Sequence, residues 1–405
     1  MGYFSQSNKG MTFIEVLVAL GVISILFTSF FYIWNSIDIF RKSRDAKRIN
    51  DLQLLDTALK TILSTENSIN LGQENIIYTS LPDSSSTCGN YNLVSVFSPY
   101  SYRCQVSGNY LNVDGSGWLP VNLNLGKILT VSVLPVDPLN NKDYFYAYQV
   151  KQGRYKFTAR FESPENISKM ISDGGFELTL YEVGSDLFIP SPHSGLVGYW
   201  TFDEGTGTIA YDLSGYGNNG SLYNFNWTAT SGWTTGKISG ALNFDGVDDR
   251  VDCGNGTSLN IANGITIEAW VNTNSYGSYK KILIKGNNIN FAFALSQGPS
   301  PYETYFIVQN SGGSKGSAIY NQNLPVGQWV HLVGTYDNYN VKLYWNGLKV
   351  ASASLSGNIN SNNESVNISG YAAGTEIFNG LIDEVHIYNR ALSDAEIQAI
   401  YNATK

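Results

Sequence analysis

Residues 11–34 read MTFIEVLVALGVISILFTSFFYIW, an apolar run that one charged residue, Glu15, interrupts. At 1.5 Å per residue, a helix of this length can cross the hydrocarbon core of a bilayer, which is about 30 Å thick. A secretory signal peptide fits less well, because its apolar region is only about 7–15 residues long and precedes a small-residue cleavage site. The run therefore predicts a membrane-spanning helix.

Glu15 marks this helix as more than an anchor, since a carboxylate inside a membrane span is costly and is a candidate for function. The string GMTFIE at residues 10–15, leading a membrane-length run, resembles the N-terminal motif of type IV pilins and pseudopilins. The resemblance implies that a prepilin peptidase removes the leader 1–10 after Gly10 and that the new amine of Met11 is methylated. It also implies that Glu15 is required for assembly. The amine of a neighbouring subunit would be its partner, because an unpaired carboxylate among packed helices is unfavourable.

The helix is predicted to continue beyond the membrane, over residues 11–65. No proline occurs before Pro82, and an apolar stripe recurs at spacings of three and four residues: Ile49, Leu52, Leu55, Leu59 and Ile62. Such a stripe indicates an amphipathic helix that packs against a globular head. A similar arrangement is found in pilins.

A basic cluster follows the apolar run: Arg41, Lys42, Arg44, Lys47 and Arg48. Lys9 is the only charged side chain before the run. The positive-inside rule alone would place the side that follows the run in the cytoplasm, whereas the resemblance to pilins places the head outside. We interpret the cluster as solvated helix charge, offset in part by Asp38, Asp45 and Asp51.

Residues 66–184 are predicted to form a small α+β pilin head with an antiparallel sheet. Tyr155, Phe157, Ala159 and Phe161 alternate with polar residues, as in a half-buried strand. Together with 144–150 and a turn at 152–153 they predict a hairpin, and residues 176–181 predict a further strand. Cys88 and Cys104 predict a disulfide in an exported protein; the alternative is two independent reduced cysteines.

Residues 185–194, SDLFIPSPHS, are predicted to be a semi-stiff linker. Residues 195–405 then show short alternating runs between Gly, Asn and Ser turns, with a helix only at the very end. This pattern predicts an all-β sandwich or barrel. Ten strands are expected, at 196–202, 241–244, 265–271, 281–285, 291–295, 305–308, 329–336, 341–345, 349–353 and 380–387.

Several strings in this module resemble laminin-G-like, concanavalin A-like jelly rolls. They include GYWTFDE at 198–204, LNFDGVDD at 242–249, IEAWV at 267–271 and GLIDEVHIYNRALS at 380–393. The resemblance implies a module that binds glycans or proteins and that can carry a structural calcium ion. We expect Asp203 and Asp383 to share such an ion with a backbone carbonyl near Asn218, because calcium prefers oxygen ligands. The alternative is that both carboxylates accept backbone hydrogen bonds in turns.

Other residues of the module are assigned as follows. An exposed aromatic contact for a ligand is predicted in a loop-like stretch, from Tyr223, Phe225, Trp227 and Trp233. The acidic loop of Asp245, Asp248, Asp249 and Asp252 is interpreted as a β-turn with solvated acids. Trp270, Trp329 and Trp345 are expected in the core, and Cys253 is expected to be a buried small hydrophobe.

Enzymatic activity is not expected. The sugar-cleaving members of the family use a pair of carboxylates close together on one strand, but Glu268 and Glu303 each lack a carboxylate two residues away. With 25 Lys+Arg against 33 Asp+Glu, the net charge is −8, which argues against nucleic-acid binding. Three His and three Cys offer little material for a His/Cys metal cluster.

The sequence thus predicts an α+β pilin followed by an all-β jelly-roll sandwich, acting as a minor or tip pilin that displays an adhesive domain. The precursor would lie in the bacterial cytoplasmic membrane and the mature subunit at the cell surface. Its partners would be other pilin subunits, the prepilin peptidase/methylase and an extracellular glycan or protein. The alternatives are a pseudopilin that recognises secretion cargo and, less favoured, a membrane-tethered glycan hydrolase.

Overall fold

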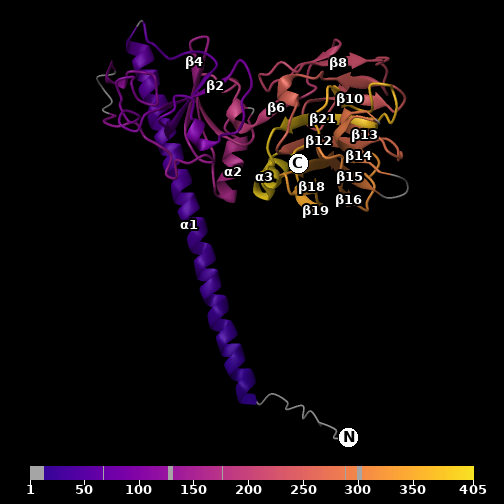
Figure 1. Ribbon diagram of the computed structural model, residues 1–405, viewed down its shortest axis with the longest axis horizontal. Helices are drawn as coiled ribbons and strands as arrows, with labels where there is room; N and C mark the ends of the chain where they lie inside the picture. Colours follow the sequence, from indigo (N-terminus) through magenta and orange to yellow (C-terminus); the bar gives the residue numbers. More distant parts are fainter. Residues whose placement is uncertain (1–12, 67, 126–130, 176, 288, 299–302) are drawn as a thin grey trace.

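The computed structural model describes residues 13–405 except 67, 126–130, 176, 288 and 299–302, and it leaves the side chains of residues 25–36 undescribed. The described chain forms a long helix, a head built around the second half of that helix, and a two-sheet sandwich beside the head (Figure 1). Gly10 and Met11, the predicted processing site, lie outside the described residues.

The helix α1 runs without a break over Phe13–Thr65, which confirms the predicted continuous helix. Its first half projects away from the body (Figure 1) and exposes apolar side chains such as Phe13 and Leu17. Its second half buries Leu52, Leu55 and Leu59 against the head, where they contact an apolar cluster that includes Trp118 and Tyr148. The predicted stripe is therefore the surface on which the head is built.

The apolar run predicted to cross a membrane lies only partly within the described residues. Residues 11 and 12 and the side chains of 25–36 fall outside them. Within the part that is described, no helix contains a stretch that is both long and apolar enough for a membrane crossing.

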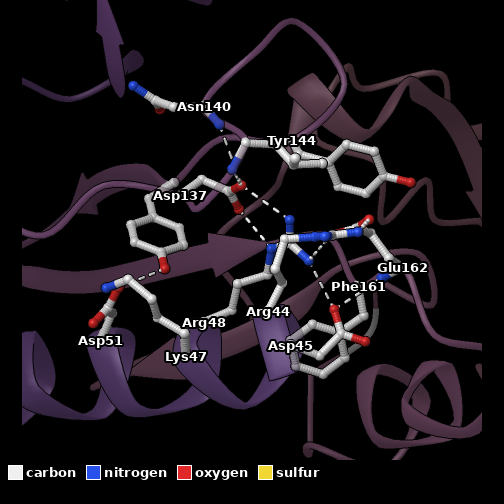
Figure 2. A network of polar contacts seen from close by, with 12 residues as sticks. Arg44, Asp45, Lys47, Arg48, Asp51, Asp137, Asn140, Tyr144, Phe161 and Glu162 are labelled. Atoms are coloured by element: carbon white, nitrogen blue, oxygen red, sulfur yellow. Dashed lines mark hydrogen bonds and ion pairs between the residues drawn. The ribbon is translucent and has the colours of Figure 1, made fainter. Parts of the chain in front are cut away.

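A buried ion-pair network fixes α1 to the head (Figure 2). The Arg48 side chain is fully buried, and its Nε and Nη1 atoms donate to Asp137 at 2.6 Å and to Glu162 at 2.6 Å. Burial alone would lower the pKa of Arg48, but these carboxylates raise it overall. Arg44 also binds Glu162, at 2.6 Å. The interpretation of the basic cluster as solvated charge is therefore wrong for these two arginines, since the head supplies carboxylates distant in sequence.

The described part of the head contains a five-stranded sheet with the order β2-β1-β3-β4-β5. Its elements are β1 (Ile76–Pro82), β2 (Ser101–Gln105), β3 (Ala147–Lys151), β4 (Arg154–Ala159), β5 (Tyr181–Gly184), the helix α2 (Pro164–Ile171), and the 3-10 turns Gly89–Tyr91 and Leu123–Leu125. The pairs β1–β3, β3–β4 and β4–β5 are antiparallel, but β1 and β2 are parallel, so the sheet is mixed rather than wholly antiparallel as predicted.

The disulfide prediction is confirmed, since Cys88 and Cys104 are bonded with a Cα–Cα distance of 5.2 Å. The hairpin β3–β4 also forms as predicted, with its turn at residues 152 and 153.

Two strand predictions in the head differ from the structure. Strand β4 is buried on both faces. On its polar face Lys156 forms a buried ion pair with Glu182 of β5, and Thr158 contacts His193 of the segment after β5. The predicted strand at 176–181 starts only at Tyr181, and residues 177–180 form a turn in which Glu177 accepts from Thr179. Phe176 lies outside the described residues. The alternation of apolar and polar residues in β4 did not reveal that its polar face is covered as well.

The described residues after 195 form two eight-stranded sheets packed face to face. The first sheet has the order β19-β18-β17-β12-β21-β10-β9, with β6 paired to β21. Its strands are β6 (Leu196–Trp200), β9 (Gly232–Thr235), β10 (Gly240–Asp245), β12 (Ile265–Thr273), β17 (Val330–Tyr336), β18 (Asn340–Trp345), β19 (Leu348–Ser354) and β21 (Asn379–Tyr388).

The second sheet has the order β16-β15-β14-β13-β20-β11-β8-β7. Its strands are β7 (Ile209–Ala210), β8 (Gly220–Tyr223), β11 (Arg250–Asp252), β13 (Lys281–Gly286), β14 (Phe291–Gln297), β15 (Thr304–Gln309), β16 (Lys315–Tyr320) and β20 (Val366–Ile368). The main core lies between the sheets and includes Trp200, Phe244, Leu283, Phe306 and Ile382. All ten predicted strands are present, and the sandwich is confirmed.

The head and the sandwich share a buried interface, which we call the head–sandwich interface. It joins α2 to α3 (Asp394–Thr404), where Ile167 and Met170 pack against Ala399. Polar contacts continue it, since Arg390 Nε donates to the carbonyl of Ser194 at 2.5 Å and Asn389 Nδ2 donates to that of Ser95 at 2.8 Å. Residues 191–194 are buried, so the end of the segment 185–194 is part of this interface rather than the spacer that its composition suggested.

Candidate ligand-binding face

The two sheets of the sandwich differ in what covers their outer faces. Helix α3 lies on the outer face of the first sheet, where Tyr401 stacks on Trp270 and Ile397 packs with Val333 and Tyr388. The head adds Leu178 and Ile171 to the same cluster. Strands β13 to β16 of the second sheet lie on the side of the sandwich away from the head (Figure 1). The outward residues of β13 and β14 are buried, whereas those of β15 and β16 are partly exposed, so the chain leaves this part of the outer face accessible.

Alternation decides which side chains this face presents. In β15, Phe306 and Val308 enter the core, so Tyr305 and Ile307 point outward. In β14, Phe293 and Leu295 face inward and Ala294 faces outward. The outward side chains, with Tyr371 from the loop after β20, surround a hollow of about 160 Å³ lined by Lys281, Asn287, Phe291, Tyr305, Ile307, Lys315 and Tyr371.

Lys281 is the central polar residue in the wall of this hollow. Its Nζ lies 2.8 Å from Glu376 and donates to the Tyr305 hydroxyl at 3.1 Å. The same nitrogen lies 5.6–5.8 Å from the ring centroids of Tyr305, Tyr279 and Tyr371. Burial alone would lower the pKa of Lys281, but Tyr305 and Glu376 raise it overall. The Lys281 side chain is thus charged, its amine is held by Glu376 and Tyr305, and it fixes the positions of the surrounding tyrosines.

The hollow has the composition of a binding site for a small polar ligand. Such sites are lined mainly by apolar and aromatic groups, with a few placed polar groups that orient the ligand. Tyr371 also lines a second hollow of about 290 Å³ beside the first, together with Asn367 and Glu364. The two hollows share Asn287 and Tyr371 in their linings, so they are adjacent and together offer aromatic rings beside hydroxyl, amide and amine groups.

Sequence reasoning did not find these tyrosines. Tyr279 precedes β13, Tyr305 lies in β15 and Tyr371 follows β20, so only the strand order brings them together. The available signal was the run at 304–309, in which an aromatic residue occupies an outward position.

Of the four predicted aromatic contacts, two are exposed. Tyr223 lies on the outer face of the second sheet with the Arg250 guanidinium 4.2 Å from its ring centroid, and Trp227 is also exposed. The prediction is wrong for Phe225, which is buried in the sandwich core. Trp233 is half-buried and donates its Nε1 proton to the Gly207 carbonyl.

The structure places the predicted calcium ligands in two different environments. Asp203 accepts from the Gly240 amide at 2.6 Å, and Asp383 accepts from the amides of residues 237 and 238, so both meet the same turn. Burial, with a further contribution from the Asp203 charge, raises the pKa of Asp383 to about 7. Asn218 is engaged elsewhere, since its carbonyl accepts from Trp200 Nε1 and its amide donates to the Val197 carbonyl. Two of the three residues come together, and the calcium ion stays a prediction.

The acidic loop leads from β10 to β11 through a bend, and the expectation that its acids are solvated is wrong for Asp249, which is fully buried. Asp249 accepts from the Asp245 amide at 2.9 Å, and the carboxylate oxygens of Asp245, Asp248 and Asp249 lie within 4.8 Å of one another. Burial raises the pKa of Asp249 to about 6. Cys253 is buried and free, as expected, and burial raises the pKa of its thiol.

The remaining carboxylates do not form a hydrolytic pair at the hollow. Glu268 lies under α3 on the first sheet, where its Oε1 is 3.0 Å from His331 Nε2, and among the described residues no carboxylate lines the hollow.

Glu15, the predicted assembly residue, lies in the exposed first half of α1.

Comparisons with known families identify two regions of the chain. Residues 245–398 match the family described as the concanavalin A-like lectin/glucanases superfamily. Residues 5–31 match the prokaryotic N-terminal methylation motif, which indicates a prepilin-type precursor. The chain therefore joins a prepilin-type N-terminus to a concanavalin A-like module, as the two resemblances implied.

Three solved structures are similar to about half of this chain. Domain 4 of AbnA, a GH43 extracellular arabinanase from Geobacillus stearothermophilus solved with arabinotriose, is 23% identical over 51% of this chain and 98% of its own, with a TM-score of 0.40. The binding domain of Paraclostridial Mosquitocidal Protein 1 is 18% identical over 52% of each chain, with a TM-score of 0.42. The botulinum neurotoxin serotype G binding domain is 15% identical over 51% of this chain and 50% of its own, with a TM-score of 0.42. No curated protein matches the chain.

Proposed function

We propose that the chain is a pilin-like subunit of a bacterial surface filament, a minor or tip pilin, and that its sandwich is a glycan-binding domain. The methylation motif supports the first part. So does the first half of α1, whose apolar side chains at residues 13, 14, 17 and 18 are exposed. Burying such a surface is strongly favourable, and in a filament the helices of other subunits would bury it.

The observation that carries the second part is the asymmetry of the sandwich. The head–sandwich interface and α3 cover the outer face of the first sheet, whereas the tyrosine-lined hollow lies on the outer face of the second. A domain fixed in this way presents its hollow away from the head. The match to the concanavalin A-like family supports a binding role for this module. Hydrolysis is not proposed, because no carboxylate among the described residues lines the first hollow and only one, Glu364, lines the second, so no pair of carboxylates is present.

Two measurements test this proposal. Mass spectrometry of the mature protein should find Met11 at the N-terminus, carrying an N-methyl group, and immunogold labelling should find the protein on filaments. Label confined to the membrane would instead indicate a pseudopilin. The purified full-length protein should bind polysaccharides, and Tyr305→Ala with Tyr371→Ala should remove the binding while Tyr339→Ala, an exposed tyrosine of a loop that follows the first sheet's strand β17, should not.

A further inference from the structure

We infer that the hollow on the second sheet takes a sugar that carries an acidic group, a carboxylate or a sulfate. This inference rests on the proposed glycan-binding function and narrows it to a class of glycan. The hollow is lined by two lysines, Lys281 and Lys315, and by no acidic residue among those described. The whole chain has a net charge of −8, whereas both charged side chains that line the hollow are positive.

The two lysines have different roles. Lys281 is buried, and Glu376 on the loop after β20 compensates its charge at 2.8 Å. Lys315 is exposed at the start of β16, and its Nζ lies 5.1 Å from the ring centroid of Phe291. Among the described residues, no carboxylate lies within 4 Å of that nitrogen. Lys315 thus brings an uncompensated positive charge to the rim of the hollow.

Tyr305 supplies a second donor. Its hydroxyl oxygen accepts from Lys281 Nζ at 3.1 Å, so its own O–H proton is left to donate outward. Asn287 is not available in the same way, because its amide donates to Glu364 at 2.7 Å and its oxygen accepts from the amides of residues 289 and 290. The polar groups that the hollow offers are therefore the ammonium of Lys315 and the hydroxyls of Tyr305 and Tyr371, and only the ammonium is charged.

A charged donor with no charged acceptor in the lining favours an anionic oxygen over a neutral hydroxyl. Hydrogen bonds to a charged group are stronger than those between neutral groups. The rings of Phe291, Tyr305 and Tyr371 would hold the sugar while Lys315 and Tyr305 bind its acidic group. A neutral sugar would satisfy the same rings but would leave the ammonium of Lys315 without a charged partner.

The test uses full-length protein in detergent and two matched pairs of polymers. One pair is polygalacturonate and its fully methyl-esterified form, and the other is dextran sulfate and dextran. The acidic member of at least one pair should bind about tenfold more tightly than the neutral member, as expected for a charge-assisted hydrogen bond. The pair that shows this preference identifies the acidic group as a carboxylate or a sulfate.

Lys315→Gln should remove about tenfold of the affinity for the acidic polymer and leave the melting temperature unchanged, because the side chain is exposed. Lys405→Gln makes the same change of net charge at the end of the helix that covers the other sheet, and it should have no effect on binding. Equal binding of acidic and neutral polymers, or equal effects of the two variants, would overturn the acidic preference and leave glycan binding intact. If none of the four polymers binds, both the acidic preference and the proposed function are overturned.

Discussion

At the scale of single residues, Arg48 and Lys47 show how much burial changes the meaning of a charge. Both belong to one basic cluster in the sequence, and both lie on α1. Arg48 is buried among three carboxylates, two of which come from residues 89 and 114 positions away. Lys47 is exposed and pairs with Asp51 on the same helix. No local pattern distinguishes them, because the partners of Arg48 are placed by the fold of the head.

This difference predicts unequal effects of two neighbouring substitutions. Arg48→Ala should lower the free energy of unfolding by about 3–5 kcal/mol, because it leaves Asp137 and Glu162 buried without their full compensation. Lys47→Ala should lower it by less than about 1 kcal/mol, as is usual for an exposed pair. Denaturant unfolding of both variants measures the difference. Similar values for the two would contradict the role of the buried network in Figure 2.

His193 predicts a pH dependence of stability. It is buried in the head–sandwich interface, where its Nε2 lies 2.7 Å from the Thr158 hydroxyl. Burial, aided by the charges of Lys156 and Arg160, lowers its pKa to about 3. The unfolded chain has the ordinary value of about 6.5, so between these values only the unfolded state binds the proton. The contribution of His193 to stability is therefore present above pH 6.5 and is lost as the pH falls toward 3.

His193→Gln removes this titration while keeping a side chain that can bind Thr158. Between pH 7 and pH 5 the wild-type protein should lose about 1–2 kcal/mol more stability than the variant. The difference between the two proteins is the relevant quantity, since it cancels the carboxylates that titrate in the same range. Parallel stability curves for the two proteins would show that His193 is accessible to protons in the folded state.

At the scale of elements, alternation and turns located the ten expected strands. Turn residues bound each strand, and one face of each strand enters the core between the two sheets. Strand β4 was located too, but the prediction that only one of its faces is buried was wrong, because β5 and the segment after it cover the other face. The same reasoning also missed the tyrosine-lined hollow. The residues of that hollow lie on strands β13, β14, β15 and β16 and on the loops after β13 and β20, which become neighbours only when the strands of the second sheet are paired. Local pattern therefore predicts elements well and predicts a site built across several elements poorly.

The head–sandwich interface predicts how the sandwich behaves when expressed alone as residues 195–405. It should fold, because its main core lies between its own two sheets. It should melt at a lower temperature than in the full chain, because α3 loses the contacts of Ala399 with Ile167 and Met170, and Arg390 loses the Ser194 carbonyl. Calorimetry of the fragment and of the full chain makes the comparison. Equal melting temperatures would show that the interface contributes nothing to the stability of the sandwich.

At the scale of the whole molecule, the sequence predicted the order of the parts but not how they fit together. The N-terminal motif, the helix and the jelly roll each have strings of their own, whereas the head–sandwich interface is made by two short helices and a proline-containing segment with no shared pattern. This interface restricts how the sandwich is oriented on the head. Because the interface is buried and hydrogen-bonded, the sandwich is held against the head and not on a free tether, so strands β13 to β16 lie on the side of the sandwich away from α1 (Figure 1).

The last prediction concerns assembly. Glu15→Leu should leave cleavage after Gly10 intact, because the apolar run is preserved, but it should block or slow incorporation into filaments when this subunit is the only pilin supplied. The reason is that the amine of the neighbouring subunit would lose its carboxylate partner. Asp38→Leu is a matched control on the same helix, since Asp38 pairs with Lys42 of its own chain at 3.1 Å and its removal should spare assembly. Electron microscopy with mass spectrometry of the processed N-terminus separates the two steps. Normal filaments from Glu15→Leu would refute the assembly role of Glu15, whereas an uncleaved leader would show that the substitution acts earlier, at the peptidase.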